Sequence, residues 1–157
     1  MKKILITGKN SYIGTSVEKW LLENPNEYAI ETIDLRDGSW IHHDFSTYDV
    51  VYHVAGIAHV SSDPKLKEHY YKVNRDLTIE VATKAKNEDV SQFIFMSSII
   101  VYGNVKGLIN HSTLPNPVDF YGDSKLQAEK GLKEIENEKF KVVILRPPMI
   151  YGKNSKG

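Results

Sequence analysis

The chain has no cysteine among its 157 residues, so it can form neither disulfide bonds nor thiolate metal sites. It has no excess of positive charge either, because 20 lysines and arginines balance 20 aspartates and glutamates. This balance does not indicate nucleic acid or an anionic membrane as a partner. No apolar run is long enough to span a bilayer, and the apolar residues between Lys3 and Thr7 are too few for a signal peptide. We therefore expect a cytoplasmic protein that binds neither nucleic acid nor membrane.

The histidines do not indicate a metal site. His42 and His43 are adjacent rather than one helical turn apart, and the remaining four show no ligand spacing. We expect structural or surface roles for them and no metal ion. His53, which ends an apolar run, is expected to pack at the end of the sheet and to lie outside the functional site.

What the chain does contain is a regular alternation of strand-like and helix-like segments. Apolar runs that predict strands lie at residues 2–7, 28–33, 49–56, 92–96 and 141–145. Apolar residues at helical spacing are Val17, Trp20 and Leu21, then a series across 73–85, then a series beginning near Tyr121. This order predicts an α/β protein of Rossmann type, a doubly wound parallel sheet with helices on both faces. The interval between Arg36 and Tyr52 is too short for complete helices, and we expect turns there with a brief edge strand at 40–42.

A glycine loop follows the first predicted strand. Gly8 to Gly14 stand between an apolar strand and an amphipathic helix, which is the order found in dinucleotide-binding turns. In such turns backbone N–H groups and the positive end of the helix hold a diphosphate. Ser11 occupies a position where a third glycine is usual, so we expect the loop to lie slightly farther from the phosphates.

An acidic residue ends the second predicted strand. Asp34 lies twenty residues after Gly14, where a carboxylate accepts hydrogen bonds from the ribose hydroxyls of NAD. Arg36 follows closely and suits the 2′-phosphate of NADP. The carboxylate repels that phosphate, so we favour NAD and leave NADP open.

A tyrosine and a lysine share one face of the last predicted helix. Tyr121 and Lys125 are four residues apart, so both side chains can act on one substrate atom. A free phenol titrates near pH ~10, and a neighbouring ammonium favours the phenolate. We therefore expect Lys125 to lower the pKa of Tyr121 toward a useful range. A solvated helix surface is the alternative for this pair when it is taken alone.

Taken together and in order, the motifs resemble one family, the extended short-chain dehydrogenases/reductases of the nucleotide-sugar epimerase/dehydratase group. The segments that carry the resemblance are Thr7–Gly14, Asp34, Asp44-Phe45, His53–Gly56, Asn74, Ser97–Gly103, Tyr121 with Lys125, and Arg146–Gly152. The resemblance spans nearly the whole chain. It implies that Ser98, Tyr121 and Lys125 are the catalytic residues. It also implies a cofactor site made of Gly8, Asn10, Ser11, Tyr12, Ile13, Gly14, Asp34, Leu35, Arg36, Asp44, Phe45, Val54, Ala55, Gly56, Asn74, Ser97, Tyr121, Lys125 and Pro148.

The resemblance assigns roles that compete with simpler ones. Ser98 would hydrogen-bond the reacting hydroxyl or carbonyl, Tyr121 would exchange its proton, and Lys125 would hold the nicotinamide ribose. Ser98 could instead cap local backbone. Asn74 could tie a loop to a strand, and Asp44 could cap a turn.

The residues after Ser98 narrow the reaction within this family. Dehydratases of the group carry an Asp-Glu pair there, whereas this chain has Ile99-Ile100, which cannot transfer protons. The resemblance therefore implies 4-epimerisation of a UDP-hexose or UDP-N-acetylhexosamine, by transient oxidation at C4, rotation of the keto sugar and return of the hydride. A 4-keto reductase or dehydrogenase and a non-catalytic dinucleotide-sensing module are the alternatives.

The resemblance also bears on domains and assembly. We expect residues 1–152 to form the NAD-binding domain and 153–157 to begin a substrate-binding region that this chain lacks, so that it is inactive alone. Family members often form homodimers through helices that correspond to residues 70–86 and 121–136, and we expect a homodimer here.

Overall fold

The computed structural model describes residues 1–57, 63–153 and 155. Its centre is a sheet of five parallel strands: β1 (Lys2–Thr7), β2 (Tyr28–Ile33), β3 (Val50–His53), β4 (Gln92–Met96) and β5 (Lys141–Leu145). The strand order is β2-β1-β3-β4-β5. The chain leaves β1 toward β2 and later returns to the other side of β1, so β1 and β3 flank the point where the winding reverses. Ligands of open α/β sheets bind at the carboxyl ends of the strands at such a point.

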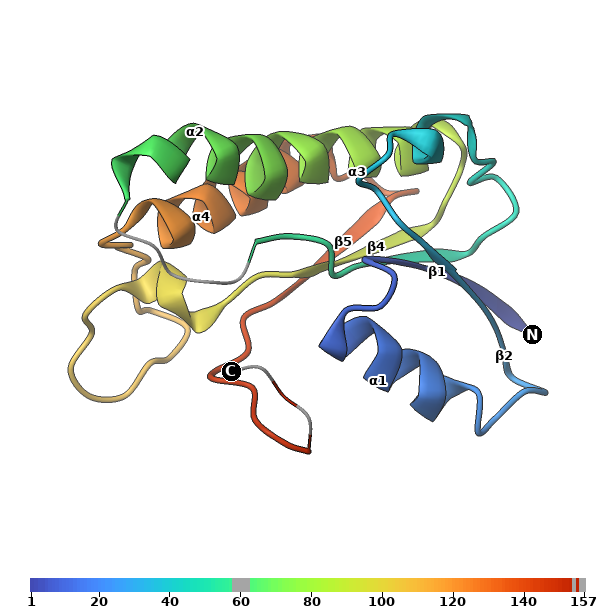
Figure 1. The fold of residues 1–157 in the computed structure, drawn as a ribbon, viewed down its shortest axis with the longest axis horizontal. Helices are drawn as coiled ribbons and strands as arrows, with labels where there is room; N and C mark the ends of the chain where they lie inside the picture. Colours follow the sequence, from blue (N-terminus) through green and yellow to red (C-terminus); the bar gives the residue numbers. More distant parts are fainter. Residues whose placement is uncertain (58–62, 154, 156–157) are drawn as a thin grey trace.

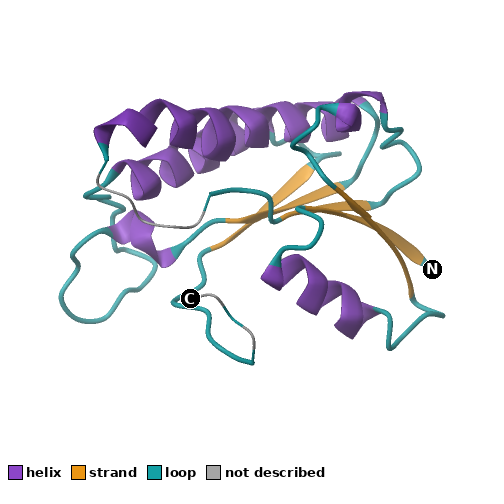
Figure 2. Ribbon diagram, viewed as in Figure 1, coloured by secondary structure: helices purple, strands orange, loops and turns teal. Residues whose placement is uncertain are grey.

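Helices cover both faces of the sheet, which confirms the predicted Rossmann-type fold (Figure 1). One face carries α1 (Tyr12–Leu21). The other carries a nearly continuous helical rod beside α4 (Phe120–Ile135) (Figure 2). The rod consists of α2 (Lys67–Tyr70), the π-helical segment η3 (Tyr71–Asp76) and α3 (Leu77–Asn87). Short 3-10 turns complete the structure: η1 (Ser39–His42), η2 (Pro64–Leu66) and η4 (Ile99–Tyr102).

Two apolar cores hold these layers together. The larger lies under α3 and α4, where Phe93 and Phe95 of the sheet are fully buried against Val81 and Leu132 of the helices. The smaller lies under α1 and includes Ile6 and Leu21. Burying a side chain of this size stabilises the fold by about 1.5–3 kcal/mol. The face that carries α3 and α4 therefore contributes the larger share.

The segment before β3 differs from its prediction. The expected edge strand at 40–42 is wrong, because Ser39–His42 form the 3-10 turn η1. Gly38 adopts a left-handed φ of 75°, and Asp37 accepts hydrogen bonds from the backbone N–H and the hydroxyl of Ser39. The chain therefore turns, and it buries the Trp40 side chain in the larger core.

Two further expectations need correction. Trp20 was expected on the apolar side of α1, but its side chain is 64% exposed whereas Leu21 is buried. Successive residues of a helix lie about 100° apart, so only one of this neighbouring pair can face the sheet. The third strand is also shorter than the 49–56 run, since β3 ends at His53. Among the described residues, no helix combines the length and apolar character needed to cross a membrane.

Candidate active site

The predicted site residues gather along the carboxyl ends of the strands. The glycine loop follows β1, Val54–Gly56 follow β3, and Ser97-Ser98 follow β4. The first turns of α4 bring Tyr121 and Lys125 to the same edge, since Tyr121 contacts Ser98 and the Lys125 ammonium reaches the last residue of β4. The structure therefore brings the loop and the Tyr121–Lys125 pair to the crevice at which the winding of the sheet reverses.

Main-chain geometry builds the glycine loop. Gly8 has a φ of +92°, and a Cβ there would lie 3.0 Å from both the Ala55 nitrogen and Val54 Cγ2. A Cβ on Gly14 would lie 2.7 Å from Ser11 Oγ. These positions admit only glycine without displacement of their neighbours. The main chain is thus left open for close approach by a ligand.

Ser11 has a specific function in this loop. Its hydroxyl oxygen accepts a hydrogen bond of 3.1 Å from the Gly14 N–H and caps α1. The N–H groups of Tyr12 and Ile13 belong to the first turn of the helix, where N–H groups have no carbonyl partner within the helix. They therefore lie at the positive end of the helix. This cradle of glycines and first-turn N–H groups fits the diphosphate of a dinucleotide.

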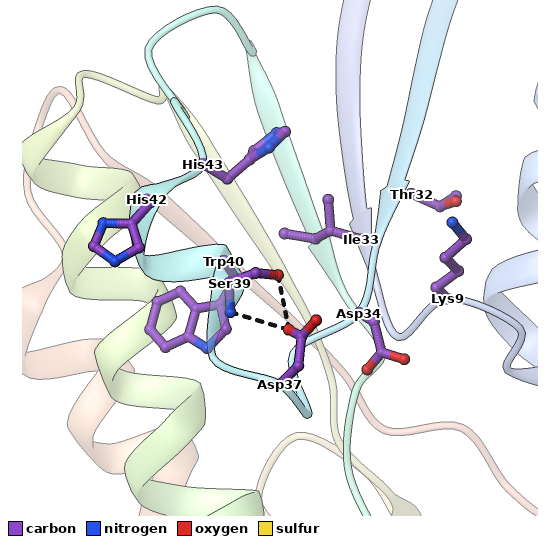
Figure 3. Close-up of a pocket in the computed structure, with 9 residues that line it drawn as sticks. All are labelled: Lys9, Thr32, Ile33, Asp34, Asp37, Ser39, Trp40, His42 and His43. Atoms are coloured by element: carbon purple, nitrogen blue, oxygen red, sulfur yellow. Dashed lines mark hydrogen bonds between the residues drawn. The ribbon is translucent and has the colours of Figure 1, made fainter.

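Asp34 lies at the end of β2 beside an open pocket of about 450 Å³. Figure 3 shows Lys9 and Asp34 on one side of this pocket and Trp40 with the Asp37–Ser39 turn on the other. Arg36 Nε donates hydrogen bonds of 3.0 and 2.9 Å to the two carboxylate oxygens of Asp34. This contact holds the pKa of Asp34 at about 2. Asp34 is thus a permanent carboxylate with cations beside it, so the site offers groups for a free ribose and for a ribose phosphate.

The two residues of the Asp44-Phe45 pair, which were expected to contact the cofactor, lie in different surroundings. Asp44 accepts hydrogen bonds from the N–H (2.9 Å) and the hydroxyl (2.6 Å) of Ser46, which is the turn-capping alternative. The side chains of Phe45 and Leu35 are buried in the larger core. Of these three residues, Asp44 alone has an exposed side chain.

Asn74 ties the turn after β3 to both helices of the larger layer. Its side-chain oxygen accepts from the Ile57 N–H at 2.8 Å, and its amide group donates to the Ile57 carbonyl and to Ser124 Oγ, each at 3.2 Å. Gly56 lies directly over this contact, because a Cβ there would be 3.0 Å from both Asn74 Oδ1 and Lys125 Nζ. The architectural alternative for Asn74 is therefore what the structure shows.

Tyr121 and Ser98 meet where the end of β4 faces the first turn of α4. Burial raises the pKa of Tyr121, whose side chain is only 8% exposed, and a side-chain hydrogen bond with Ser98 opposes that rise. Ser98 Oγ also accepts a hydrogen bond of 3.3 Å from the Ile100 N–H, so it caps η4 as well. The phenol is therefore protonated at neutral pH.

Lys125 does not act on the phenol as the sequence predicted. Its ammonium donates a hydrogen bond of 3.0 Å to the Met96 carbonyl and lies 4.8 Å from the centre of the Phe95 ring. Burial lowers the pKa of Lys125 to about 8. The expected lowering of the pKa of Tyr121 is wrong for this structure, because the ammonium is bound to the strand end and desolvation dominates at the phenol.

His53 lies in a buried chain of hydroxyls beside the site. Its Nδ1 is 2.8 Å from Thr7 Oγ1, and its Nε2 is 3.0 Å from Thr78 Oγ1. The Thr78 hydroxyl donates to the Asn74 carbonyl, so it accepts from Nε2–H, and Nδ1 accepts from Thr7. Burial lowers the pKa of His53 to about 3 and keeps it neutral. The prediction that it packs at the end of the sheet is confirmed.

Sequence reasoning missed Glu129 and Arg146 as a pair. The Ser97 hydroxyl, expected to face a cofactor, donates instead to Glu129, and Arg146 forms an ion pair with the same carboxylate. The available signal was the position of Glu129, one helical turn after Lys125 on the buried face of α4. Pro148 is exposed beyond this pair.

Comparison with known proteins matches this geometry to one family. Residues 4–157 match the family described as the NAD dependent epimerase/dehydratase family. UDP-glucose 4-epimerase of Vibrio cholerae is 31% identical over 96% of this chain and 52% of its own length. The chain spans about half the length of the curated relatives it matches.

Solved structures agree in fold. UDP-glucuronic acid 4-epimerase from Bacillus cereus, in complex with NAD, is 27% identical with a TM-score of 0.81, over 96% of this chain and 57% of that one. dTDP-4-dehydrorhamnose reductase from Bacillus anthracis, in complex with NADP, is 26% identical with a TM-score of 0.84, over 99% of this chain and 57% of that one. The Rossmann-type sheet, the glycine loop, the Ser98–Tyr121 contact and the family match lead to one conclusion: the chain belongs to the NAD dependent epimerase/dehydratase family.

Proposed function

We propose that residues 1–152 are the NAD(H)-binding domain of a nucleotide-sugar 4-epimerase. The observation that carries this proposal is the contact between Ser98 and Tyr121 at the carboxyl end of β4, with Lys125 and the glycine loop along the same edge of the sheet. The epimerases from Vibrio cholerae and Bacillus cereus support it as relatives in sequence and fold.

The roles of the chain's own residues follow from their positions. Gly8, Gly14 and the first turn of α1 bind the diphosphate, and Asp34 accepts from a ribose hydroxyl. The Ser98 hydroxyl hydrogen-bonds the C4 oxygen of the sugar. The positive nicotinamide ring of a bound oxidised cofactor would favour the phenolate of Tyr121, which would then take up the proton of that oxygen and later return it. When bound, the dinucleotide supplies the acceptor and donor of the C4 hydride.

The identity of the residues after Ser98 supports epimerisation over dehydration. Removal of water needs a further acid and base beside the reacting carbon, and Ile99 and Ile100 supply neither. A UDP-hexose or UDP-N-acetylhexosamine is the proposed substrate. The curated relatives are about twice as long as this chain, and we propose that their additional region is needed to hold the substrate. Residues 1–157 would then bind cofactor but would not turn over substrate alone. The homodimer and the cytoplasmic location stay predictions.

Two measurements test the proposal. Calorimetric titration of the 157-residue chain with NAD and NADP should show binding of a dinucleotide, with NAD preferred; failure to bind either would contradict the cofactor assignment. A protein of the relatives' length should interconvert UDP-glucose and UDP-galactose without net consumption of NADH, whereas the 157-residue chain should not. Comparable rates for the two proteins would contradict the proposed inactivity of the shorter one.

A 4-keto reductase is the second candidate. It is favoured by the TM-score of 0.84 over 99% of this chain with the reductase from Bacillus anthracis, and by Arg36 beside the ribose site. The same side chains would serve, with the proton of Tyr121 given to the C4 oxygen once per turnover. Stoichiometric consumption of NADH or NADPH with a 4-keto sugar nucleotide would select the reductase.

A further inference from the structure

An ion pair between a buried carboxylate and a half-buried guanidinium lies behind the proposed catalytic residues. Glu129, on the same face of α4 as Tyr121 and Lys125, is 2% exposed. Arg146 Nε donates to Glu129 Oε1 at 3.0 Å, and its Nη2 donates to Oε2. Ser97 Oγ also donates to Oε1. The carboxylate of α4 is thus held by two residues from outside its own helix.

The arginine extends this contact to the other side of Ser98. Arg146 Nη1 donates a hydrogen bond of 2.6 Å to the hydroxyl of Tyr102, and the guanidinium lies 4.9 Å from the centre of that ring. Tyr102 is the last residue of the 3-10 turn η4, which begins directly after Ser98. Ser97 directly precedes Ser98 in the chain. The Glu129–Arg146 pair therefore contacts both flanks of the turn that carries Ser98.

Backbone hydrogen bonds join this turn to the segment after β5, and among the described residues none joins it to α4. The Ser97 N–H donates to the Leu145 carbonyl at 2.8 Å, and the Ile99 N–H donates to the Pro147 carbonyl at 3.0 Å. These bonds fix Ser98 relative to Arg146. The bond from Arg146 to Glu129 then fixes both relative to the helix that carries Tyr121.

Stability is a poor explanation for such a pair. Taking two charges out of water costs several kcal/mol per ion, and a well-packed apolar replacement is often as stable or more so. A buried pair that links two elements instead fixes their relative position. We propose that Glu129 and Arg146 are positioning residues, which hold the turn that carries Ser98 in place so that the Ser98 hydroxyl faces the Tyr121 phenol.

This inference rests on the proposed roles of Ser98 and Tyr121. A double-mutant cycle tests the positioning role separately from those proposed roles. The 157-residue chain is labelled with 13C at tyrosine Cζ, Tyr121 is assigned by Tyr121→Phe, and its signal is followed at pH 7 and through a pH titration. In the parent chain, Ser98→Ala should move the signal and raise the pKa of Tyr121 by about 0.5 to 1, the effect of one hydrogen bond. In a Glu129→Gln or Arg146→Lys background, the same change should have less than half of this effect, because the hydroxyl no longer reaches the phenol.

The matched control is Glu88→Gln. Glu88 is also a partly buried carboxylate with a lysine partner, Lys84, and it accepts from the Phe45 N–H, but it lies outside the site. The Ser98→Ala effect should be full in this background. Asp119 and Tyr70, the other titratable groups that act on the phenol, are unchanged in all variants.

Each outcome decides between the two claims. A full Ser98→Ala effect in the Glu129→Gln and Arg146→Lys backgrounds would overturn the positioning role and leave the catalytic pair intact. No Ser98→Ala effect in the parent chain would overturn the Ser98–Tyr121 contact and both claims with it. If Glu129→Gln does not fold, Tyr102→Phe removes only the hydroxyl that Arg146 contacts, and a full Ser98→Ala effect there and in Arg146→Lys overturns the inference.

Discussion

The two ends of the crevice are built from different parts of the chain. At the glycine-loop end we propose that the main chain recognises the ligand, since the side chains of Lys9, Asn10 and Arg36 are exposed. At the phenol end we propose that buried side chains do so, since Tyr121 and Lys125 are both below 9% exposed. Recognition by main chain tolerates a change of side chain such as Ser11, provided that the backbone angles are kept. Recognition by buried side chains depends on every partner in the surrounding network.

The largest expected effect is at the phenol end. Tyr121→Phe removes the proton donor, and we expect turnover by a protein of the relatives' length to fall by about 10²- to 10⁴-fold. Dinucleotide affinity should stay within a factor of two or so, since the loop end is untouched. Parallel measurement of sugar interconversion and of NAD binding checks this. Unchanged turnover would count against both enzyme proposals and leave the dinucleotide-sensing module.

At the loop end, we expect Gly8→Ala to abolish most dinucleotide binding. The new Cβ would meet the Ala55 main chain and would stand at a left-handed φ. Gly107→Ala is the matched control, because Gly107 has a φ of +103° but nothing within 4 Å of its Cβ position. Both variants should lose stability by about 1–2 kcal/mol from backbone strain, and only Gly8→Ala should lose affinity. If the two variants have equal stability in urea unfolding and lose equal dinucleotide affinity, backbone strain alone, and not the close approach of the main chain, would explain the loss of affinity.

The buried ammonium at the phenol end should cost stability. The pKa of Lys125 is about 8 when folded, below its ordinary 10.5, so its contribution is favourable above the ordinary value and is lost as the pH falls through 8. At pH 7 we therefore expect Lys125→Met to be more stable than the parent chain, by about 1–3 kcal/mol after loss of the Met96 bond. Urea unfolding at pH 7 and pH 10.5 checks the sign, since the gain should vanish at the higher pH.

The control for that comparison is Lys130→Met, on the exposed side of α4. It should leave the urea midpoint nearly unchanged at both pH values. A destabilised Lys125→Met at pH 7 would show that packing and the Met96 bond outweigh the burial of the charge.

The smallest effect concerns the choice of cofactor. Arg36→Ala releases the Asp34 carboxylate from an exposed ion pair, and we expect the ratio of NAD to NADP affinity to rise by about three- to fivefold. Because the pKa of Asp34 is about 2, the carboxylate stays ionised between pH 5 and 8, so any change of this ratio with pH comes from the 2′-phosphate of NADP, which titrates near pH ~6, and not from Asp34. Calorimetric titration with both dinucleotides at two pH values measures it. A lower ratio in the variant would mean that Arg36 favours NAD.

The parts of the molecule that sequence predicted are those written in local patterns. The five strands were predicted because each is an apolar run bounded by glycine, aspartate or polar residues, and their order dictated the fold class. Ser11 was recognised as a departure, but its capping role was missed although serine is a preferred residue at that position. The turns between residues 36 and 49 were predicted, but the edge strand at 40–42 was wrong, because left-handed Gly38 begins a 3-10 turn there.

The parts that sequence could not predict depend on distance in space. The Glu129–Arg146 pair joins residues from α4 and the segment after β5, and no spacing in the chain indicates that they meet. The direction of the Lys125 ammonium was equally hidden, because it depends on the Met96 carbonyl at the end of β4. The pKa of Tyr121 followed burial, which a helical spacing rule does not measure.

The π-helical segment Tyr71–Asp76 between α2 and α3 has a consequence for the length of the chain. Such a wide turn contains one residue more than a regular helical path, and it places Asn74 in the buried position from which it reaches the loop after β3. A chain shortened by one residue here would rewind into an ordinary helix, and the wide turn that gives Asn74 its position would be lost. The extra residue therefore acts as a local spacer: α2 and α3 continue as one rod, and the wide turn between them carries the Asn74 amide to the loop after β3.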